Sequence, residues 1–415
     1  MSTVERQPAT LKPIYDPRRA LEHIQTLPGV APVRLFAILF PLWDIETTAR
    51  QEEGRPYELM EKYVERGIEE GQLHTVEELA AFFGLQGEII QKILLFLKTI
   101  GHVTQQGTRW DLTTLGRKSV RGGMRYVSQE KHVRFYFDAY TSQPLRKKHY
   151  EGKKVRIFSP EEAAEILHMK TWGYRFHLIT SMQAWRAASL RELEARVDRG
   201  DYNMPAEMRE VQVLAVRPAY LPMYVIETTR KGRTPASTGS SIEYRPHYLV
   251  YTGIRNLRDT YFERIINDTT MIYAALRGEK EAVQHDLWDA WLHEKGITGI
   301  PLERPDGTWQ IALPSSTFEG PQAKFATTRV GDYDLRDGYF MQIWCDNQAL
   351  RRKAALDLAL RLVKGQQRFI KRQDLQEHLQ LLEMQLQVAQ LSIKDVRQRA
   401  VETKKEDLMK VLDNL

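Results

Sequence analysis

The strongest constraint on this chain is a regular apolar spacing in its C-terminal part. From residue 350 onward there is no proline and a single glycine, Gly365. Apolar residues recur at alternating intervals of four and three, which is the spacing of helices that bury one face against another helix. The pattern predicts helices over residues 349–415, arranged as a coiled coil or as a long helical hairpin. The apolar stripe consists of Leu375, Leu379, Leu382, Leu386, Ala389, Ile393, Val396 and Ala400.

A single helix cannot bury this stripe by itself, so a second copy, a partner protein or the preceding helix has to cover it. The small Ala389 and Ala400 remove apolar contact relative to leucine, which favours a partner or the chain itself over a long homodimer. Ser392 and Asp395 form a capping pattern that can begin a new helix and fold the tail back. The predicted interface residues are Leu375, Leu379, Leu382, Leu386 and Ile393.

Residues 57–120 carry a second regular pattern. Thr75 and Glu78 have the spacing of a capping box, and Gly84 is suited to end the helix that they begin. Gly107 separates two short β-prone segments, as expected for a hairpin turn. The predicted segments are helices over 57–64, 75–84 and 88–100, and strands over 103–105 and 109–112.

This succession, with the Gly84-Leu85, Gly101-His102-Val103 and Trp110–Arg117 sequences, resembles the winged helix-turn-helix superfamily of MarR-like and ArsR-like domains. The resemblance covers residues 57–120 and implies a winged-helix fold that contacts DNA. A DNA-reading third helix normally exposes polar side chains in its N-terminal half. Here residues 94–97 are all apolar, which is typical of a buried helix or a protein-docking module. Phosphate contact is therefore favoured over base recognition.

Positive charge is concentrated in two zones, although the net charge of the 415 residues is only +6. Residues 101–156 hold thirteen Lys and Arg against four Asp and Glu, and residues 351–372 hold eight against one. Such zones favour a polyanionic partner, and the alternative is that they are solvated faces. The residues predicted to contact nucleic acid are Gln91, Lys92, Arg109, Arg117, Lys118, Arg121, Arg125, Arg146, Lys147 and Lys148.

We expect an α+β multidomain fold with an N-terminal winged helix, a central mixed α+β domain and a C-terminal coiled coil. The predicted domains are a lead-in that packs on the winged helix (1–56), the winged helix (57–120), the α+β domain (121–348) and the helical region (349–415). The segments predicted for the central domain are strands over 133–140, 153–158, 210–216, 220–229, 244–252, 309–313 and 339–344, and helices over 159–169, 174–197, 257–276 and 279–295.

The single cysteine, Cys345, excludes a disulfide framework and a cysteine-rich metal site, and it fits a reducing cytoplasm. The first residues lack the apolar core of a signal peptide. Residues 35–43 are apolar, but they are too short to span a bilayer and contain Pro41. We expect a cytoplasmic protein without a membrane partner, and these residues to form a buried helix or strand.

One group of charged residues has the pattern of a catalytic site. Asp138 at the end of a predicted strand, followed by Glu151 and Lys153, resembles the core of PD-(D/E)xK nucleases. The resemblance implies that the carboxylates hold Mg²⁺ and that the lysine activates water. The family usually has an apolar residue where Gly152 stands, and no further acid from a preceding helix is identified. The alternative, which we favour, is a salt-bridged hairpin without metal or cofactor.

These observations predict a non-enzymatic accessory subunit that binds DNA or another nucleic acid through phosphates and docks to a partner or to itself through its C-terminal helices. By analogy, such an architecture suits a prokaryotic DNA-processing or antiviral defence system. Two alternatives are the Mg²⁺-dependent nuclease and a ligand-sensing transcription regulator with the central domain as its sensor.

Overall fold

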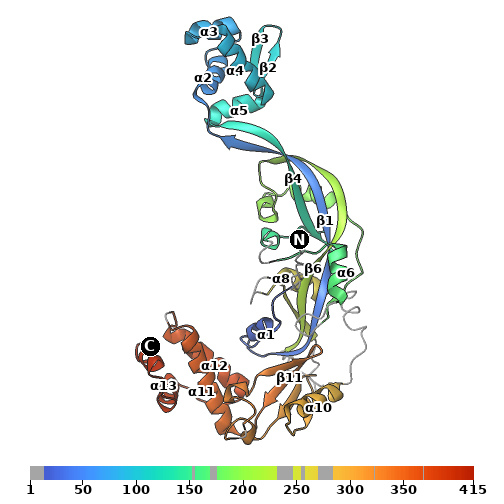
Figure 1. Cartoon of the computed structure of the whole chain (residues 1–415), viewed down its shortest axis with the longest axis vertical. Helices are drawn as coiled ribbons and strands as arrows, with labels where there is room; N and C mark the ends of the chain where they lie inside the picture. The colour runs from blue at the N-terminus through green and yellow to red at the C-terminus, as the bar shows by residue number, and fades with distance from the viewer. Residues whose placement is uncertain are drawn as a thin grey trace, which may run out of the picture. The chain divides into compact units, whose positions relative to one another are not determined.

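The computed structural model of the chain describes residues 14–151, 155–168, 175–230, 246–253, 258–269, 284–321, 323–367 and 369–415 (Figure 1). The chain divides into two compact units. Unit 1 comprises Met1–Pro41, Gly152–Ser181 and Tyr220–Leu415, and unit 2 comprises Leu42–Glu151 and Met182–Ala219.

A nine-stranded sheet dominates the described part of the N-terminal and central regions. Its main path has the order β7-β6-β1-β11-β9-β8, while β4 and β5 pair with β1 and β10 pairs with β11. The strands β1 and β6 each begin in one unit and end in the other. The bounds are β1 Val30–Arg55, β4 Arg125–Asp138, β5 His177–Leu178, β6 Met208–Arg230, β7 Pro246–Tyr251, β8 Pro301–Glu303, β9 Trp309–Ala312, β10 Tyr333–Arg336 and β11 Tyr339–Trp344.

The predicted fold class is wrong, and β1 is the reason. Residues 1–56 are not a lead-in, because they contain the strand to which β4, β5, β6 and β11 all pair. Antiparallel pairing of β1 with β4 runs from Leu42 opposite Asp138 to Arg55 opposite Arg125. Residues 57–122 are therefore an insertion between the paired strands β1 and β4. They are not an N-terminal winged helix that precedes a separate α+β domain. The apolar run 35–42 is a buried strand, one of the two predicted possibilities.

The inserted segment contains α2 (Leu59–Glu69), α3 (Val76–Phe83), α4 (Gly87–Thr99), the hairpin β2 (Val103–Gln106) and β3 (Arg109–Leu112), and α5 (Thr114–Gly122). Local predictions are confirmed here. Thr75 and Glu78 form the capping box, and Gly84 ends α3 with a φ of 65°. A small core that includes Leu79, Leu94 and Trp110 holds these elements together.

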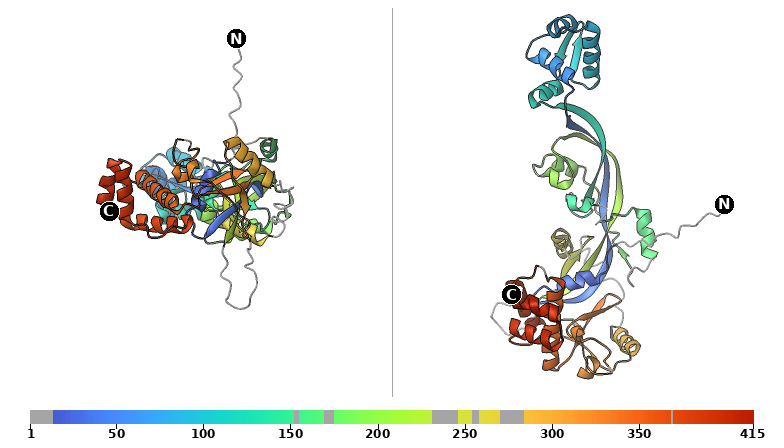
Figure 2. Two further views of the ribbon diagram at one scale, coloured as in Figure 1. Left: turned by 90° about the horizontal axis from the view of Figure 1, so that it is seen from below. Right: turned by 60° about the vertical axis from the view of Figure 1, so that its left-hand side comes forward.

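The C-terminal region contains four helices instead of a long coiled coil. Figure 2 shows them as a group in both views. These are α11 (Gln348–Gly365), α12 (Arg372–Leu386), α13 (Ile393–Glu402) and α14 (Glu406–Asp413). Gln387 ends α12 in the left-handed conformation (φ 51°), so the stripe does not continue as one helix. The predicted new helix is confirmed, because Ser392 and Asp395 form a capping box at the start of α13. The stripe residues Leu375, Leu379, Leu382 and Leu386 of α12 are buried in the core of unit 1.

Several central predictions are also corrected. Most of the helix predicted over 174–197 is absent; the described part of that range contains β5 and the short α7 (Ala188–Glu194). The two strands predicted over 210–229 are the single strand β6, and β4 begins at Arg125 instead of residue 133. Residues 153 and 154 of another predicted strand lie outside the described residues. The remaining described elements are α1 (Arg18–Ile24), η1 (Lys147–Tyr150), α6 (Pro160–His168), η2 (Arg199–Tyr202), α8 (Thr260–Asp268), α10 (Gln284–Lys295), η3 (Ser315–Thr317) and η4 (Thr327–Arg329).

Within the residues that the structure describes, no single helix has the length and apolar character needed to cross a membrane. Taken together, α3 and α4 satisfy the same criteria, but their axes bend by 119° at the junction.

Candidate nucleic-acid interface

The basic face of α5 is the candidate site in unit 2. Thr113 caps the helix, because its side chain accepts a hydrogen bond from the Gly116 amide at 3.2 Å and donates to the Gly101 carbonyl at 2.7 Å. Gly116 has to lack a side chain, since a Cβ there would overlap the carbonyl oxygen of His102. The helix can therefore approach the loop before β2 closely. A cavity of about 510 Å³ lies along α5 and is lined by Thr114, Arg117, Lys118, Arg121, Gly122 and Tyr126.

The cations of this face are only partly neutralised. Glu69 faces two of them, with its carboxylate 3.5 Å from Arg117 Nε and 3.7 Å from Arg121 Nη2. The Lys118 ammonium pairs with Glu52 and lies 4.5 Å from the centre of the Tyr126 ring. The Arg121 side chain is 76% exposed and that of Arg117 is 48% exposed. Both arginines can therefore turn toward an anion in solvent at small cost, because exposed ion pairs contribute little.

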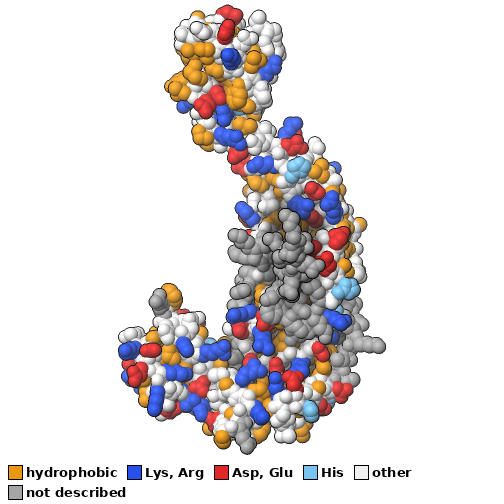
Figure 3. Space-filling model, viewed as in Figure 1, with side chains coloured by type: hydrophobic (Ala, Val, Ile, Leu, Met, Phe, Trp, Pro, Cys, Tyr) orange, Lys and Arg blue, Asp and Glu red, His pale blue; other side chains and the backbone are white. Residues whose placement is uncertain are grey.

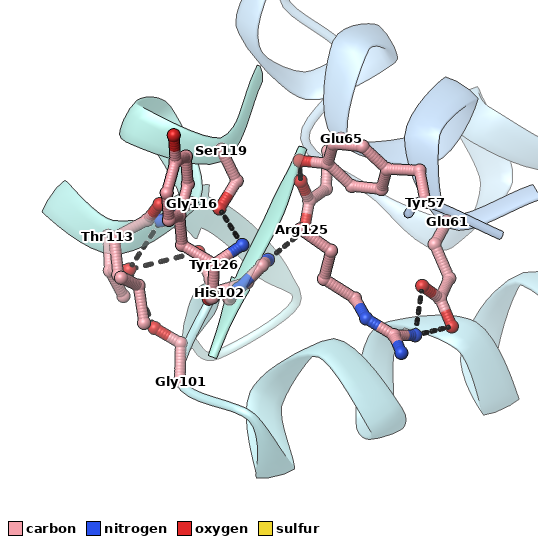
Figure 4. Close-up of polar contacts among 11 residues, drawn as sticks. Tyr57, Glu61, Glu65, Gly101, His102, Thr113, Gly116, Ser119, Arg125 and Tyr126 are labelled. Carbon is pink, nitrogen blue, oxygen red and sulfur yellow. Dashed lines mark hydrogen bonds and ion pairs between the residues drawn. The ribbon is translucent and has the colours of Figure 1, made fainter. Parts of the chain in front are cut away.

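A buried polar network holds α5 in place (Figure 4). His102, whose side chain is fully buried, contacts Glu65 Oε1 through Nδ1 at 2.5 Å and the Tyr126 carbonyl through Nε2 at 2.6 Å. The second oxygen of Glu65 accepts a hydrogen bond from the Tyr57 hydroxyl at 2.5 Å. The Ser119 hydroxyl of α5 accepts from the Tyr126 amide at 3.0 Å. The network thus ties α2, the loop before β2, α5 and the start of β4 to one another.

The surroundings of His102 favour its charged form. Both of its ring nitrogens face acceptors, a carboxylate and a carbonyl, so both have to donate. Burial works to lower the pKa of His102, but the hydrogen bonds to Glu65 and to the Tyr126 carbonyl outweigh it and the pKa lies above its ordinary value. Burial and the bond to Glu65 also raise the pKa of Tyr57. These contacts favour an ion pair between His102 and Glu65, whose side chains are both fully buried.

Arg125 belongs to this support and not to the surface, which corrects its predicted role. Its Nη1 donates to both oxygens of Glu61, at 3.0 and 2.7 Å, and its side chain is only 17% exposed. The guanidinium also lies 5.7 Å from the centre of the Phe96 ring. Removing it from Glu61 would leave a partly buried carboxylate unpaired, so Arg125 is not available to a phosphate.

The other predicted contact residues do not line the α5 cavity. Arg109 pairs with Asp111 beside it on β3, at 3.0 Å. Gln91 and Lys92 are exposed on α4. Arg146, Lys147 and Lys148 lie at the start of η1, after the end of β4. Only three of the ten predicted contact residues, Arg117, Lys118 and Arg121, are therefore brought together at this cavity.

The nuclease constellation does not have the character of a metal site in the described residues. Asp138 is fully buried, and its carboxylate accepts hydrogen bonds from the amides of Tyr140, Thr141 and Gln143 at 2.6 to 3.1 Å. It also accepts a hydrogen bond from the Thr141 hydroxyl at 2.5 Å. These bonds close the turn after β4, which supports a structural role. Glu151 is exposed, Lys153 lies outside the described residues, and no group of three His, Cys, Asp or Glu in the described part of the chain can hold a metal ion.

The predicted interface on α12 is an internal surface. Leu375, Leu379, Leu382 and Leu386 are at most 3% exposed, and Ile393 packs against the same core. Exposed apolar side chains gather instead on the helical segment of unit 2, where Figure 3 shows hydrophobic atoms over α2 and α4. The helix α4 is thus not covered on every side, which corrects the expectation of a buried helix and leaves the protein-docking alternative untested. The large exposed side chains there are Leu59, Met60, Tyr63, Phe82, Ile89, Leu95, Phe96 and Met124.

Sequence reasoning missed the acids that support this site. Glu61, Glu65 and Glu69 lie four residues apart on α2, so they occupy one face of that helix. That spacing was the available signal for a carboxylate row opposite the basic residues. Comparison with models of protein families, with curated proteins and with solved structures finds no match for this chain.

Proposed function

We propose that this chain binds nucleic acid through the phosphate backbone, with α5 as the contacting element. One observation carries the proposal: Arg117, Lys118 and Arg121 line one open cavity, and among the described residues only Glu69 and Glu52 are their acidic partners. Guanidinium and ammonium groups are the side chains that bind phosphates best, and a charged groove attracts a polyanion from a distance. The Thr114 hydroxyl at the edge of the cavity can donate a further hydrogen bond.

We infer binding with little sequence preference. The cavity residues are cations suited to phosphates, and contacts of this kind position a protein on a duplex without distinguishing its bases. The buried His102–Glu65 pair supports the backbone beside α5, while the exposed side chains of Arg117 and Arg121 can still turn toward a phosphate.

We further propose that the protein acts as an accessory subunit and not as a nuclease, because the carboxylate of Asp138 is engaged by its own turn. The same proposal places it in the cytoplasm, in a prokaryotic DNA-processing or antiviral defence assembly. This assignment rests on the phosphate contact proposed for α5 and not on the predicted architecture, which the pairing of β1 corrects.

The experiment compares Arg117→Ala/Arg121→Ala with the matched control Arg186→Ala/Arg191→Ala, which removes the same charge from exposed positions outside the cavity. Affinity for a mixed-sequence duplex and a single strand is measured by fluorescence anisotropy at low salt. We expect the α5 variant to lose at least about tenfold in affinity, since two charge-assisted contacts are removed. The control keeps wild-type affinity. Equal affinity of both variants, or no binding by the wild type, would overturn the proposal, and so would a footprint on one defined sequence.

A further inference from the structure

A second basic cavity, of about 320 Å³, lies in unit 1 between α11, η4 and the junction of α13 with α14. Four residues of α11 line it at spacings of three, four and seven positions, so they share one face of that helix. The lining residues are Thr328, Asp357, Leu360, Arg361, Lys364, Arg399, Thr403 and Lys405.

The acid in this cavity is already neutralised. Arg399 binds Asp357 with Nε at 2.8 Å and Nη2 at 3.0 Å, and both side chains are at most 14% exposed. The Thr327 hydroxyl donates to the same carboxylate at 3.2 Å. Arg399 has a second partner in Glu402, at 3.1 Å. This paired arrangement forms one wall, and the fully buried Leu360 contributes to another.

Three cations remain without an acidic partner among the described residues: Arg361, Lys364 and Lys405. All three are exposed, and the first two lie one helical turn apart on α11. Lys405 is placed by a tight turn in which Lys404 adopts a φ of 54°. Figure 3 shows Lys and Arg side chains gathered over these C-terminal helices. Like charges in one concave site repel one another, and a bound anion removes that cost.

We propose that this cavity binds the phosphate group of a small phosphorylated ligand. Two ammonium groups and a guanidinium match the charge and oxygens of a phosphate, and Thr328 supplies a hydroxyl. The volume is at the lower end of the roughly 300–1,000 Å³ range of small-molecule pockets. No aromatic ring from the described part of the chain lines the cavity, so the phosphate is the recognised group and not a stacked base. The proposal does not depend on the function proposed for α5, because the two cavities share no residue.

The test uses thermal unfolding of the full chain in inorganic phosphate and in sodium chloride of equal ionic strength. We expect phosphate to raise the Tm of the wild type by about 3 °C or more at saturation. The shift is lost in Arg361→Ala/Lys364→Ala. It is retained in Lys394→Ala/Lys410→Ala, a control that removes two exposed cations from α13 and α14 outside the cavity. Lys405→Ala, in the connecting turn, gives an independent variant if the first does not fold.

Two further ligands distinguish the source of the phosphate. A mononucleotide that raises the Tm more than phosphate, through the same residues, assigns the cavity to a free metabolite. A short oligonucleotide that raises the Tm more than the mononucleotide, by a margin that Arg361→Ala/Lys364→Ala removes, assigns it to a nucleic-acid backbone. A phosphate effect no larger than that of chloride, or one that both cavity variants retain, would overturn the proposal. Neither result depends on Arg117 and Arg121, so failure here is separable from failure of the α5 proposal.

Discussion

At the scale of single residues, the position of α5 depends on His102. Its ring bridges Glu65 on α2 and the backbone of Tyr126 on β4, and no solvent reaches it. Two further titratable groups act on this pair. The Tyr57 hydroxyl donates a hydrogen bond to the second oxygen of Glu65, and the positive charge of Arg125 works to lower the pKa of His102. A neutral residue in place of His102 leaves the Glu65 carboxylate buried without its cation.

The first prediction concerns His102→Gln. Removing one partner of a buried ion pair costs about 3 to 5 kcal/mol, so the free energy of unfolding should fall by about that amount. In the unfolded chain the pKa of His102 returns to about 6.5, below its raised folded value. The pair therefore contributes fully below about pH 6.5, and the contribution is lost as the pH rises through the folded pKa.

Urea unfolding of the wild type should accordingly show decreasing stability above about pH 6.5, and the variant should have a flatter profile. His132→Gln, an exposed position on β4, is the matched control and should keep the wild-type profile. The same pH dependence in wild type and His102→Gln would show that the pair is not charged.

The second prediction concerns Asp138→Asn. The Asp138 carboxylate accepts hydrogen bonds from three backbone N–H groups. The side-chain amide of asparagine would place its own N–H donors against some of these donors, so at least one backbone N–H would lose its acceptor. We expect the free energy of unfolding to fall by about 1 to 3 kcal/mol. The exposed Asp201→Asn should have little effect. A folded Asp138→Asn protein that loses Mg²⁺-dependent cleavage would instead support the nuclease alternative.

At the scale of elements, local patterns were informative where the partner is close in sequence. The capping boxes of α3 and α13 were predicted from four residues each, because the side chain and the amide that it caps lie three positions apart. The stripe of α12 was correctly predicted to need a cover. Its spacing could not show that α11 and the neighbouring strands supply that cover, because a heptad pattern contains no information on which surface it meets.

The third prediction tests that internal cover. Leu382→Ala should lower the free energy of unfolding by about 2 to 5 kcal/mol, since the side chain is 3% exposed and its removal leaves a cavity. Met384→Ala, on the same helix at 57% exposure, should change it little. Size-exclusion chromatography with light scattering should give both folded variants the mass of the wild type. A change of mass in folded Leu382→Ala would contradict the internal assignment.

At the scale of the whole molecule, the sequence did not predict the nine-stranded sheet. It also did not predict which acidic residues pair with the cations of the basic zone. The partners of β1 come from residues 125–138, 177–178, 208–230 and 339–344, and no local pattern specifies such distant pairing. The basic zone of residues 101–156 was counted without Glu52, Glu61 and Glu69, which precede it in the chain but pair with its cations. Of the predicted site, only the part on α5 lines the candidate cavity.

The central claim is that phosphates meet α5 itself, and the salt dependence of duplex affinity tests it most directly. With Arg117, Lys118 and Arg121 in contact, the log–log slope of affinity against salt should be about −3, since each contact contributes about −0.9. Arg117→Ala/Arg121→Ala should reduce its magnitude to about 1, while Arg125→Ala, at a half-buried position paired with Glu61, should destabilise the fold without a comparable change in slope. A slope that is unchanged in Arg117→Ala/Arg121→Ala would contradict the account.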